Sequence, residues 1–150
     1  MTRERGGARA RHLARELLVK ALYQWQIAGH SVAEISAQFA ADEDFASCDR
    51  DFFGQLLAVT IDDVPALDTI IARQATRGIE TLDAVGRAIL LLGLAELKFR
   101  DDVPSKVVIN EAIELAKRFG PTDSFKFVNA VLDKSSRELR GGAAKAGGES

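Results

Sequence analysis

The fold is decided by the stretch LDAVGRAILLLGLAELK, residues 82–98 of the chain. Its first apolar residues recur on one face of a helix, and the uninterrupted apolar run 88–95 then covers nearly the whole circumference. A helix that is apolar on every side is surrounded by other elements in a folded protein. We therefore expect this segment to form a helix at the centre of the domain.

Amphipathic helical patterns extend outward from this segment in both directions. Polar caps, glycines and prolines mark the ends of the expected helices, which cover residues 8–27, 31–39, 52–59, 63–78, 82–97, 105–119 and 123–139. Ser31 and Glu34 have the spacing of a capping box, and the acidic residues 42–44 are expected to form a loop. The sequence thus predicts an all-α protein, a compact bundle of about seven helices.

Length and composition bound the class of protein. A chain of 150 residues with 47% hydrophobic residues suits one domain with a real core. We expect a helical domain over residues 8–140, between a flexible basic arm (1–7) and a disordered Gly- and Ala-rich tail (141–150). The longest apolar run, residues 88–95, is far shorter than the ~20 residues that span a bilayer. No apolar stretch follows the N-terminal arginines, so the sequence shows no secretory signal. The single cysteine, Cys48, fits a reducing compartment, so we expect a cytoplasmic protein without a membrane segment.

Catalytic and metal-binding motifs are absent from the sequence. It has no phosphate-binding glycine loop, dinucleotide fingerprint or nucleophile elbow. His12 and His30 lie on different expected elements and, with one cysteine, do not make a zinc site. Glu96 falls on an apolar helix face, where it is either a perturbed acid or a carboxylate paired with an arginine such as Arg100. No second catalytic group accompanies it, so we expect neither an enzyme nor a cofactor.

Charge is unevenly distributed along the chain, although the net charge is only −2. The first turns of the first expected helix carry Arg9, Arg11, His12 and Arg15. Helix N-termini disfavour cations, because the macrodipole is already positive there. Arginine offers bidentate contacts to phosphates and planar stacking on bases. The pattern predicts that a polyanion approaches this end, while the alternative is a solvated, mobile tail.

The last expected helix carries an aromatic residue at the edge of its apolar stripe. By helical angle Phe127 lies on the flank that carries Asp123 and Lys126. An aromatic ring beside cations can serve as a base-stacking platform, although Phe127 alone also fits a residue at the rim of the core. The residues by themselves therefore indicate a helical domain whose basic edge binds RNA or an acidic protein.

Three blocks of the sequence carry a family resemblance. Residues 14–26 (ARELLVKALYQWQ), 103–117 (VPSKVVINEAIELAK) and 126–133 (KFVNAVLD) resemble the first, penultimate and last helices of the NusB family of transcription antitermination factors. They stand in family order, and the similarity extends over about residues 8–138. The resemblance implies an all-helical fold of two packed halves without enzymatic activity. It also implies binding of the boxA element of nascent RNA together with NusE, a ribosomal protein that doubles as a transcription factor.

The resemblance also implies which residues bind and where the chain departs from the family. Such factors help RNA polymerase resist termination, notably on ribosomal RNA operons. The implied RNA-binding residues are Arg9, Arg11, His12, Arg15, Phe119, Asp123, Lys126 and Phe127. The implied partner-binding residues are Tyr23 and Glu96. Departures from the family pattern are Leu13, where a basic residue is frequent, Gly86, where an acidic residue is common, Ala95 in place of tyrosine and Ala130 in place of glycine.

Two other interpretations remain beside this one. A protein-only helical adaptor would use the basic edge to bind an acidic partner. The similar helical domain of some ribosomal RNA cytosine methyltransferases is disfavoured, because the chain carries no cofactor-binding glycine motif. The sequence leaves open whether the protein is a monomer or a weak homodimer.

Overall fold

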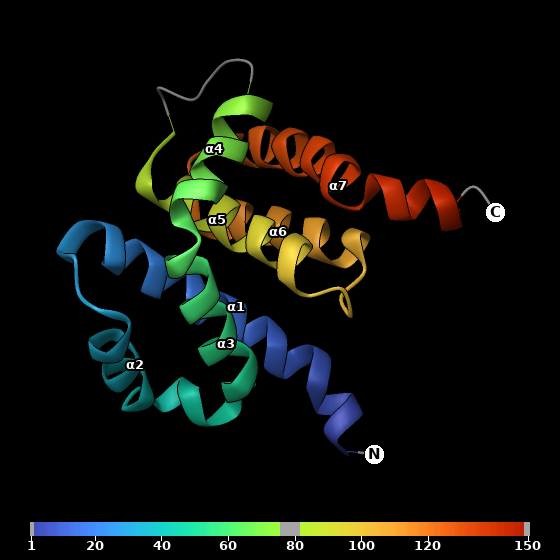
Figure 1. Ribbon diagram of the computed structural model, residues 1–150. Helices are drawn as coiled ribbons and strands as arrows, with labels where there is room; N and C mark the ends of the chain where they lie inside the picture. The colour runs from blue at the N-terminus through green and yellow to red at the C-terminus, as the bar shows by residue number, and fades with distance from the viewer. Residues whose placement is uncertain (1, 76–81, 149–150) are drawn as a thin grey trace. The chain divides into compact units, whose positions relative to one another are not determined.

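The computed structural model describes residues 2–75 and 82–148, with side chains described over 7–75 and 82–141. These residues form helices and no strand (Figure 1). The elements are α1 (Thr2–Ala28), α2 (Val32–Ala40), the 3-10 helix η1 (Glu43–Ser47), α3 (Arg50–Asp62), α4 (Val64–Gln74), α5 (Ala84–Phe99), α6 (Ser105–Phe119) and α7 (Ser124–Gly148). The prediction of an all-α protein with about seven helices is confirmed for this part of the chain.

The chain divides into two compact helical units, residues 1–62 and 63–150. The first, here called the N-terminal unit, contains α1, α2, η1 and α3. The second, the C-terminal unit, contains α4, α5, α6 and α7. Each unit contains its own buried apolar side chains, and each contains some of the binding residues predicted from the sequence.

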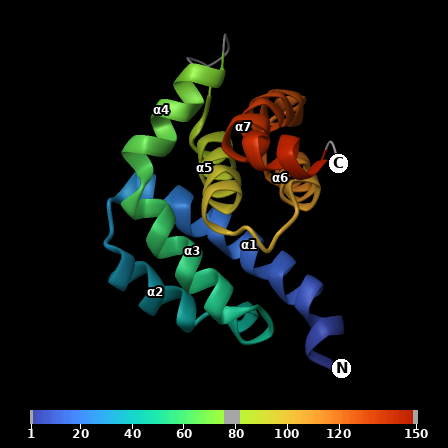
Figure 2. The same cartoon turned by 45° about the vertical axis from the view of Figure 1, so that its right-hand side comes forward.

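In the N-terminal unit, α1 packs against α2 and α3 (Figure 2). Phe53 on α3 lies at the centre of an aromatic cluster, with ring centroids 5.7 Å from Phe39 and 5.4 Å from Phe45. The predicted capping box at the start of α2 is present, because Ser31 Oγ accepts from the Glu34 amide (3.1 Å) and Glu34 Oε1 accepts from the Ser31 amide (2.8 Å). The amide and hydroxyl of Ser31 lower the pKa of the Glu34 carboxyl.

In the C-terminal unit, α5 is the central helix, as the sequence predicts. It packs against α4, α6 and α7 (Figure 2), and every residue from 88 to 97 is buried. Gly93 lets α7 approach closely, since a Cβ there would lie 2.9 Å from a methyl of Leu132. On the surface, Arg73 of α4 binds Glu138 of α7 at 2.7 Å and lowers the pKa of that carboxyl.

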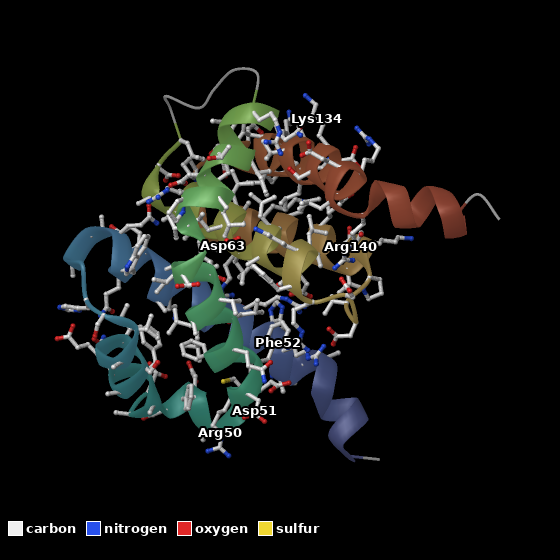
Figure 3. All side chains as sticks on the ribbon, viewed as in Figure 1. Arg50, Asp51, Phe52, Asp63, Lys134 and Arg140 are labelled. Carbon is white, nitrogen blue, oxygen red and sulfur yellow. The ribbon has the colours of Figure 1, made fainter. Side chains whose placement is uncertain are left out.

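The C-terminal end of α5 is closed by Arg140, a residue of α7 (Figure 3). Its guanidinium donates five hydrogen bonds, to the carbonyls of Leu97 (2.9 Å), Val103 (2.7 Å), Glu96 (3.1 Å) and Arg100 (2.8 Å) and to Ser105 Oγ (3.1 Å). The last carbonyls of a helix lack partners within the helix. One side chain therefore satisfies the end of α5 and fixes the turn to α6.

Several boundaries differ from the predicted ones. Helix α1 begins at Thr2 and α7 continues to Gly148, so both helices extend beyond the predicted bounds 8–27 and 123–139. Extending an existing helix adds one hydrogen bond per residue at little further cost, and alanine is the best helix former. Asp42 caps η1 where a loop is predicted. The predicted end of the fourth helix at Gly78 lies outside the described residues.

Candidate nucleic-acid interface

The four basic residues near the start of α1 belong to the N-terminal unit and are here called the α1 basic cluster: Arg9, Arg11, His12 and Arg15. Arg9 is exposed, whereas the side chain of Arg11 is 32% exposed. Arg11 Nε donates to Asp49 Oδ2 at 3.4 Å, and its guanidinium lies 4.7 Å from the centre of the Phe52 ring. His12 Nε2 lies 3.2 Å from Glu16 Oε2, one turn further along α1.

Asp49 is held firmly in place opposite this cluster. Its amide donates to the Ala10 carbonyl at 3.0 Å, and its Oδ1 accepts from the Phe52 amide at 3.0 Å. The carboxylate therefore caps the start of α3 with one oxygen and binds Arg11 with the other. Within the N-terminal unit, Arg11 therefore contacts both the Asp49 carboxylate and the Phe52 ring.

Arg15 is buried, although the sequence places it among the residues that a polyanion is expected to approach. It is only 3% exposed, and its guanidinium lies 4.9 Å from the Phe52 ring centre. A buried, ring-stacked arginine stabilises packing and is not presented to a large ligand. The helical spacing places Arg15 at the flank of the apolar stripe, but it does not reveal that Phe52 of α3 lies against that flank.

A second set of predicted residues gathers in the C-terminal unit where α6 ends and α7 begins. This region, residues 117–127, is here called the α6–α7 corner. Asp123 directly precedes α7 in the left-handed region (φ 70°), a conformation that Asp adopts more readily than most residues. Lys126 Nζ lies 3.8 Å from Asp123 Oδ1, and both side chains are largely exposed. Phe119 and Phe127 are each partly exposed.

Cations lie against aromatic rings at this corner. The Arg118 guanidinium is 5.2 Å from the Phe119 ring centre, and Lys117 Nζ is 4.9 Å from that of Phe125. Lys117 and Arg118 were not among the residues predicted from the sequence, and their contacts with the two rings were missed. Two adjacent cations in the last turn of α6, followed within eight residues by two phenylalanines, were the available signal.

A pocket of about 350 Å³ opens beside Phe127. Its wall consists of Leu82, Asp83 and Gly86 from the start of α5, and of residues 121–124, Phe127 and Val128. Asp83 caps α5, because its Oδ1 accepts from the Gly86 amide at 2.8 Å. The pocket lies entirely within the C-terminal unit and includes the predicted residues Asp123 and Phe127.

The two predicted partner-binding residues differ sharply in exposure. Tyr23 of α1 is 43% exposed, and Ile27, one helical turn further, is 64% exposed. Together they form an apolar pair on the surface of the N-terminal unit, and sequence reasoning missed Ile27. Glu96 of α5 is only 2% exposed. The alternative drawn from its position on an apolar face, a buried structural carboxylate, fits this burial.

The described residues contain no cluster of metal-ligating side chains. No group of three or more His, Cys, Asp or Glu side chains there could hold a metal ion. Burial raises the pKa of the Cys48 thiol, which disfavours the nucleophilic thiolate. None of the described helices has the length and apolar character needed to cross a membrane.

Comparison with known proteins decides the family. The model of the NusB family matches residues 12–137. This chain belongs to the NusB family. Transcription antitermination protein NusB of Alcanivorax borkumensis is 53% identical over 131 residues, which cover 87% of this chain and 87% of the relative. Its namesake in Photorhabdus laumondii is 47% identical over 131 residues, covering 87% and 95%.

The fold agrees with that of a solved NusB. The structure of T. maritima NusB matches with a TM-score of 0.73 and 30% identity, over 85% of this chain and 90% of that one. The resemblance first seen in three helices therefore extends over most of the chain.

Proposed function

We propose that the protein is a transcription antitermination factor that binds boxA single-stranded RNA together with NusE, and so promotes processive transcription of ribosomal RNA operons. The observation that carries the proposal is the α6–α7 corner, where partly exposed rings, three cations and a pocket occur together in a member of the NusB family. Proteins that bind single strands combine cations along the backbone with rings on which bases stack. We assign the protein to the cytoplasm.

In this proposal the α1 basic cluster contributes electrostatic attraction. Arg9 is exposed and contacts a phosphate directly. Arg11 exchanges the Asp49 carboxylate for a phosphate, at a small cost because partly exposed ion pairs contribute little. His12 adds positive charge when protonated, while buried Arg15 holds α3 against α1 and is no longer among the proposed contacts.

At the α6–α7 corner the rings contribute stacking. Phe127 contacts a base, and Lys126 attracts the adjoining phosphate. Phe119 carries the Arg118 guanidinium on its face, which offers a flat cationic surface to RNA. Asp123 is a like-charge neighbour that limits affinity and favours bases with hydrogen-bond donors.

NusE docks on the surface formed by Tyr23 and Ile27 in the same proposal. Two adjacent exposed apolar side chains on one helix face are a common feature of protein interfaces. The Tyr23 ring supplies area at a low entropic cost, and its hydroxyl remains available to water or to the partner.

A gel-shift titration tests the proposal. Labelled boxA RNA and a scrambled control of the same composition are titrated with the protein at moderate salt, with and without NusE. We expect boxA RNA to shift at lower protein concentration than the control, and NusE to tighten the complex further. Equal binding of both RNAs, or none, contradicts the proposal. A partner complex that survives nuclease treatment without any RNA shift would instead support the adaptor.

A further inference from the structure

We infer that the turn between α5 and α6 carries a docking surface for a second copy of this chain, so that the protein forms a weak symmetric dimer through its C-terminal unit. The surface, here called the α5–α6 face, consists of Phe99, Asp101, Lys106 and Val107. It requires neither RNA nor NusE, and the inference therefore goes beyond the proposed function and is tested separately from it.

The α5–α6 face contains two exposed apolar side chains. Among the described residues, only four large hydrophobic side chains are exposed, and two of them flank this turn. Phe99, at the end of α5, is 43% exposed, and Val107, in the first turn of α6, is 41% exposed. The other two are Tyr23 and Ile27 of the N-terminal unit. Single exposed apolar residues are ordinary, whereas two on either side of one short turn indicate an interaction surface.

The turn that carries these side chains is fixed by hydrogen bonds. The Val103 amide donates to the Arg100 carbonyl at 3.0 Å. From α7, the Arg140 guanidinium donates to the carbonyls of these two residues and to the hydroxyl of Ser105 (Figure 3). A surface that is ordered before binding loses little conformational entropy when it docks, which favours association even over a small area.

The charged residues of the α5–α6 face indicate its occupant. Asp101 and Lys106 are both exposed, and neither forms an ion pair with another described residue. Two other cations near the turn are already bound by carboxylates within the C-terminal unit: Lys98 by Asp63 (2.6 Å) and Arg100 by Asp102 (2.8 Å). The region is therefore close to neutral and does not attract a polyanion. One unpaired acid and one unpaired base beside the same apolar pair make the face complementary to itself.

A two-fold axis through the α5–α6 face brings the opposite charges together. In a symmetric dimer the same surface is used twice, so Asp101 of one protomer faces Lys106 of the partner subunit, and the reverse. Phe99 and Val107 of both copies then lie in the middle with the charges at the rim, the usual anatomy of a protein interface. A small face suits the class of weak complexes that bury less than roughly 1,200 Å², and we expect a dissociation constant on the order of 100 μM.

Sedimentation equilibrium of the full chain, without RNA, tests for the dimer. We expect the average mass to rise toward twice that of the monomer as the protein concentration increases from about 5 μM to about 1 mM. Phe99→Ser should weaken the dimer about tenfold or more, as loss of a central aromatic contact does. Ile27→Ser changes an exposed apolar residue of the N-terminal unit and is the matched control that should keep the dimer. A protein that stays monomeric at the highest concentration overturns the inference.

Charge exchange tests the symmetric pairing. Asp101→Lys and Lys106→Asp each place like charges opposite one another twice, so each variant alone should dimerise about tenfold more weakly or worse. Mixing the two variants in equal amounts restores opposite charges across a heterodimer, and the average mass should rise again. Both side chains are exposed, so neither substitution disturbs the core. Single variants that dimerise like the wild type, or a mixture that stays monomeric, overturn the inference.

The remaining outcomes assign the surface to another occupant. A dimer that Ile27→Ser breaks and Phe99→Ser leaves intact forms through the surface of Tyr23 and Ile27, and the inference is wrong. If the chain stays monomeric and Phe99→Ser weakens NusE binding, the α5–α6 face binds that protein, and the inference is again wrong. The gel-shift titration, and none of these measurements, decides the proposed binding of boxA RNA.

Discussion

The α1 basic cluster and the α6–α7 corner contain similar residue types but use them differently. In the α1 basic cluster, Arg11 and Arg15 both lie against Phe52, and Arg11 also binds Asp49. At the α6–α7 corner, Arg118 and Lys117 lie against rings while their own side chains stay exposed. A cation beside a ring therefore stabilises the core where it is buried and remains available at the surface where it is exposed.

The largest expected effect concerns Phe52, the buried ring that Arg11 and Arg15 contact. Phe52→Ala removes a 1% exposed ring and should lower the free energy of unfolding by about 3–5 kcal/mol. Chemical denaturation followed by circular dichroism measures it. Phe99→Ala, at a 43% exposed ring, is the control and should change stability little. Equal losses in the free energy of unfolding for the two variants would mean that the Phe52 ring is not part of the core.

The next prediction separates the two roles of arginine within the α1 basic cluster. Arg15→Ala should destabilise the fold by about 2 kcal/mol, because it removes a desolvated cation–ring contact. Arg9→Ala should leave stability unchanged and lower the salt slope of RNA binding by about 0.7, the value for one phosphate contact on a single strand. The measurements are a urea titration and RNA titrations at several salt concentrations. If Arg9→Ala destabilised the fold and Arg15→Ala only lowered the salt slope, the structural role given to the buried Arg15 would be wrong.

At the α6–α7 corner, the Phe127 ring is expected to stack on an RNA base. Phe127→Ala should weaken boxA binding by roughly tenfold, within the range of about 1–3 kcal/mol for one stacked base. Its stability loss should remain below that of Phe52→Ala, since Phe127 is partly exposed. Fluorescence anisotropy with labelled RNA gives the affinity. Unchanged affinity together with a large stability loss would make Phe127 a core residue.

A smaller effect is expected from releasing Arg11. Asp49→Asn keeps an oxygen that can cap α3 but removes the charge that holds Arg11. RNA binding should tighten by up to about fivefold, the scale of a partly exposed ion pair. The anisotropy titration, repeated at high salt, measures the gain. A loss of affinity would show that Asp49 positions Arg11 for RNA and does not compete with it.

The smallest expected effect concerns the carboxylate at the α6–α7 corner. Asp123→Asn keeps a residue that tolerates the left-handed conformation and removes one negative charge. RNA affinity should rise by about twofold, because an exposed like charge costs little at moderate salt. An isothermal titration measures the change. No gain, or a loss, would mean that the negative charge of Asp123 does not limit RNA affinity.

Local patterns predicted much of this fold. The apolar run 88–95 placed α5 at the centre of its unit, and the spacing of Ser31 and Glu34 predicted a capping box that the structure contains. These features depend on residues within one or two helical turns. The same locality explains why the predicted first and last helices are shorter than α1 and α7, because glycines near both ends of the chain indicate helix ends there.

The candidate sites depended on contacts that no local pattern contains. Arg15 is buried because Phe52, 37 positions later, lies against it. Glu96 could be placed on an apolar face from its helical angle, but its near-complete burial depends on the helices that pack around α5. The pocket at Gly86 requires the starts of α5 and α7 to meet, which spacing alone does not show.

The guanidinium of Arg140 also sets an order for how the C-terminal unit is completed. The carbonyls that it binds belong to residues 96–103, which are synthesised some forty positions earlier. Until α7 reaches them, water must solvate the frayed end of α5, and contacts so distant in sequence form late in folding. A nascent chain that stops before residue 140 therefore carries a central helix whose final turn remains open.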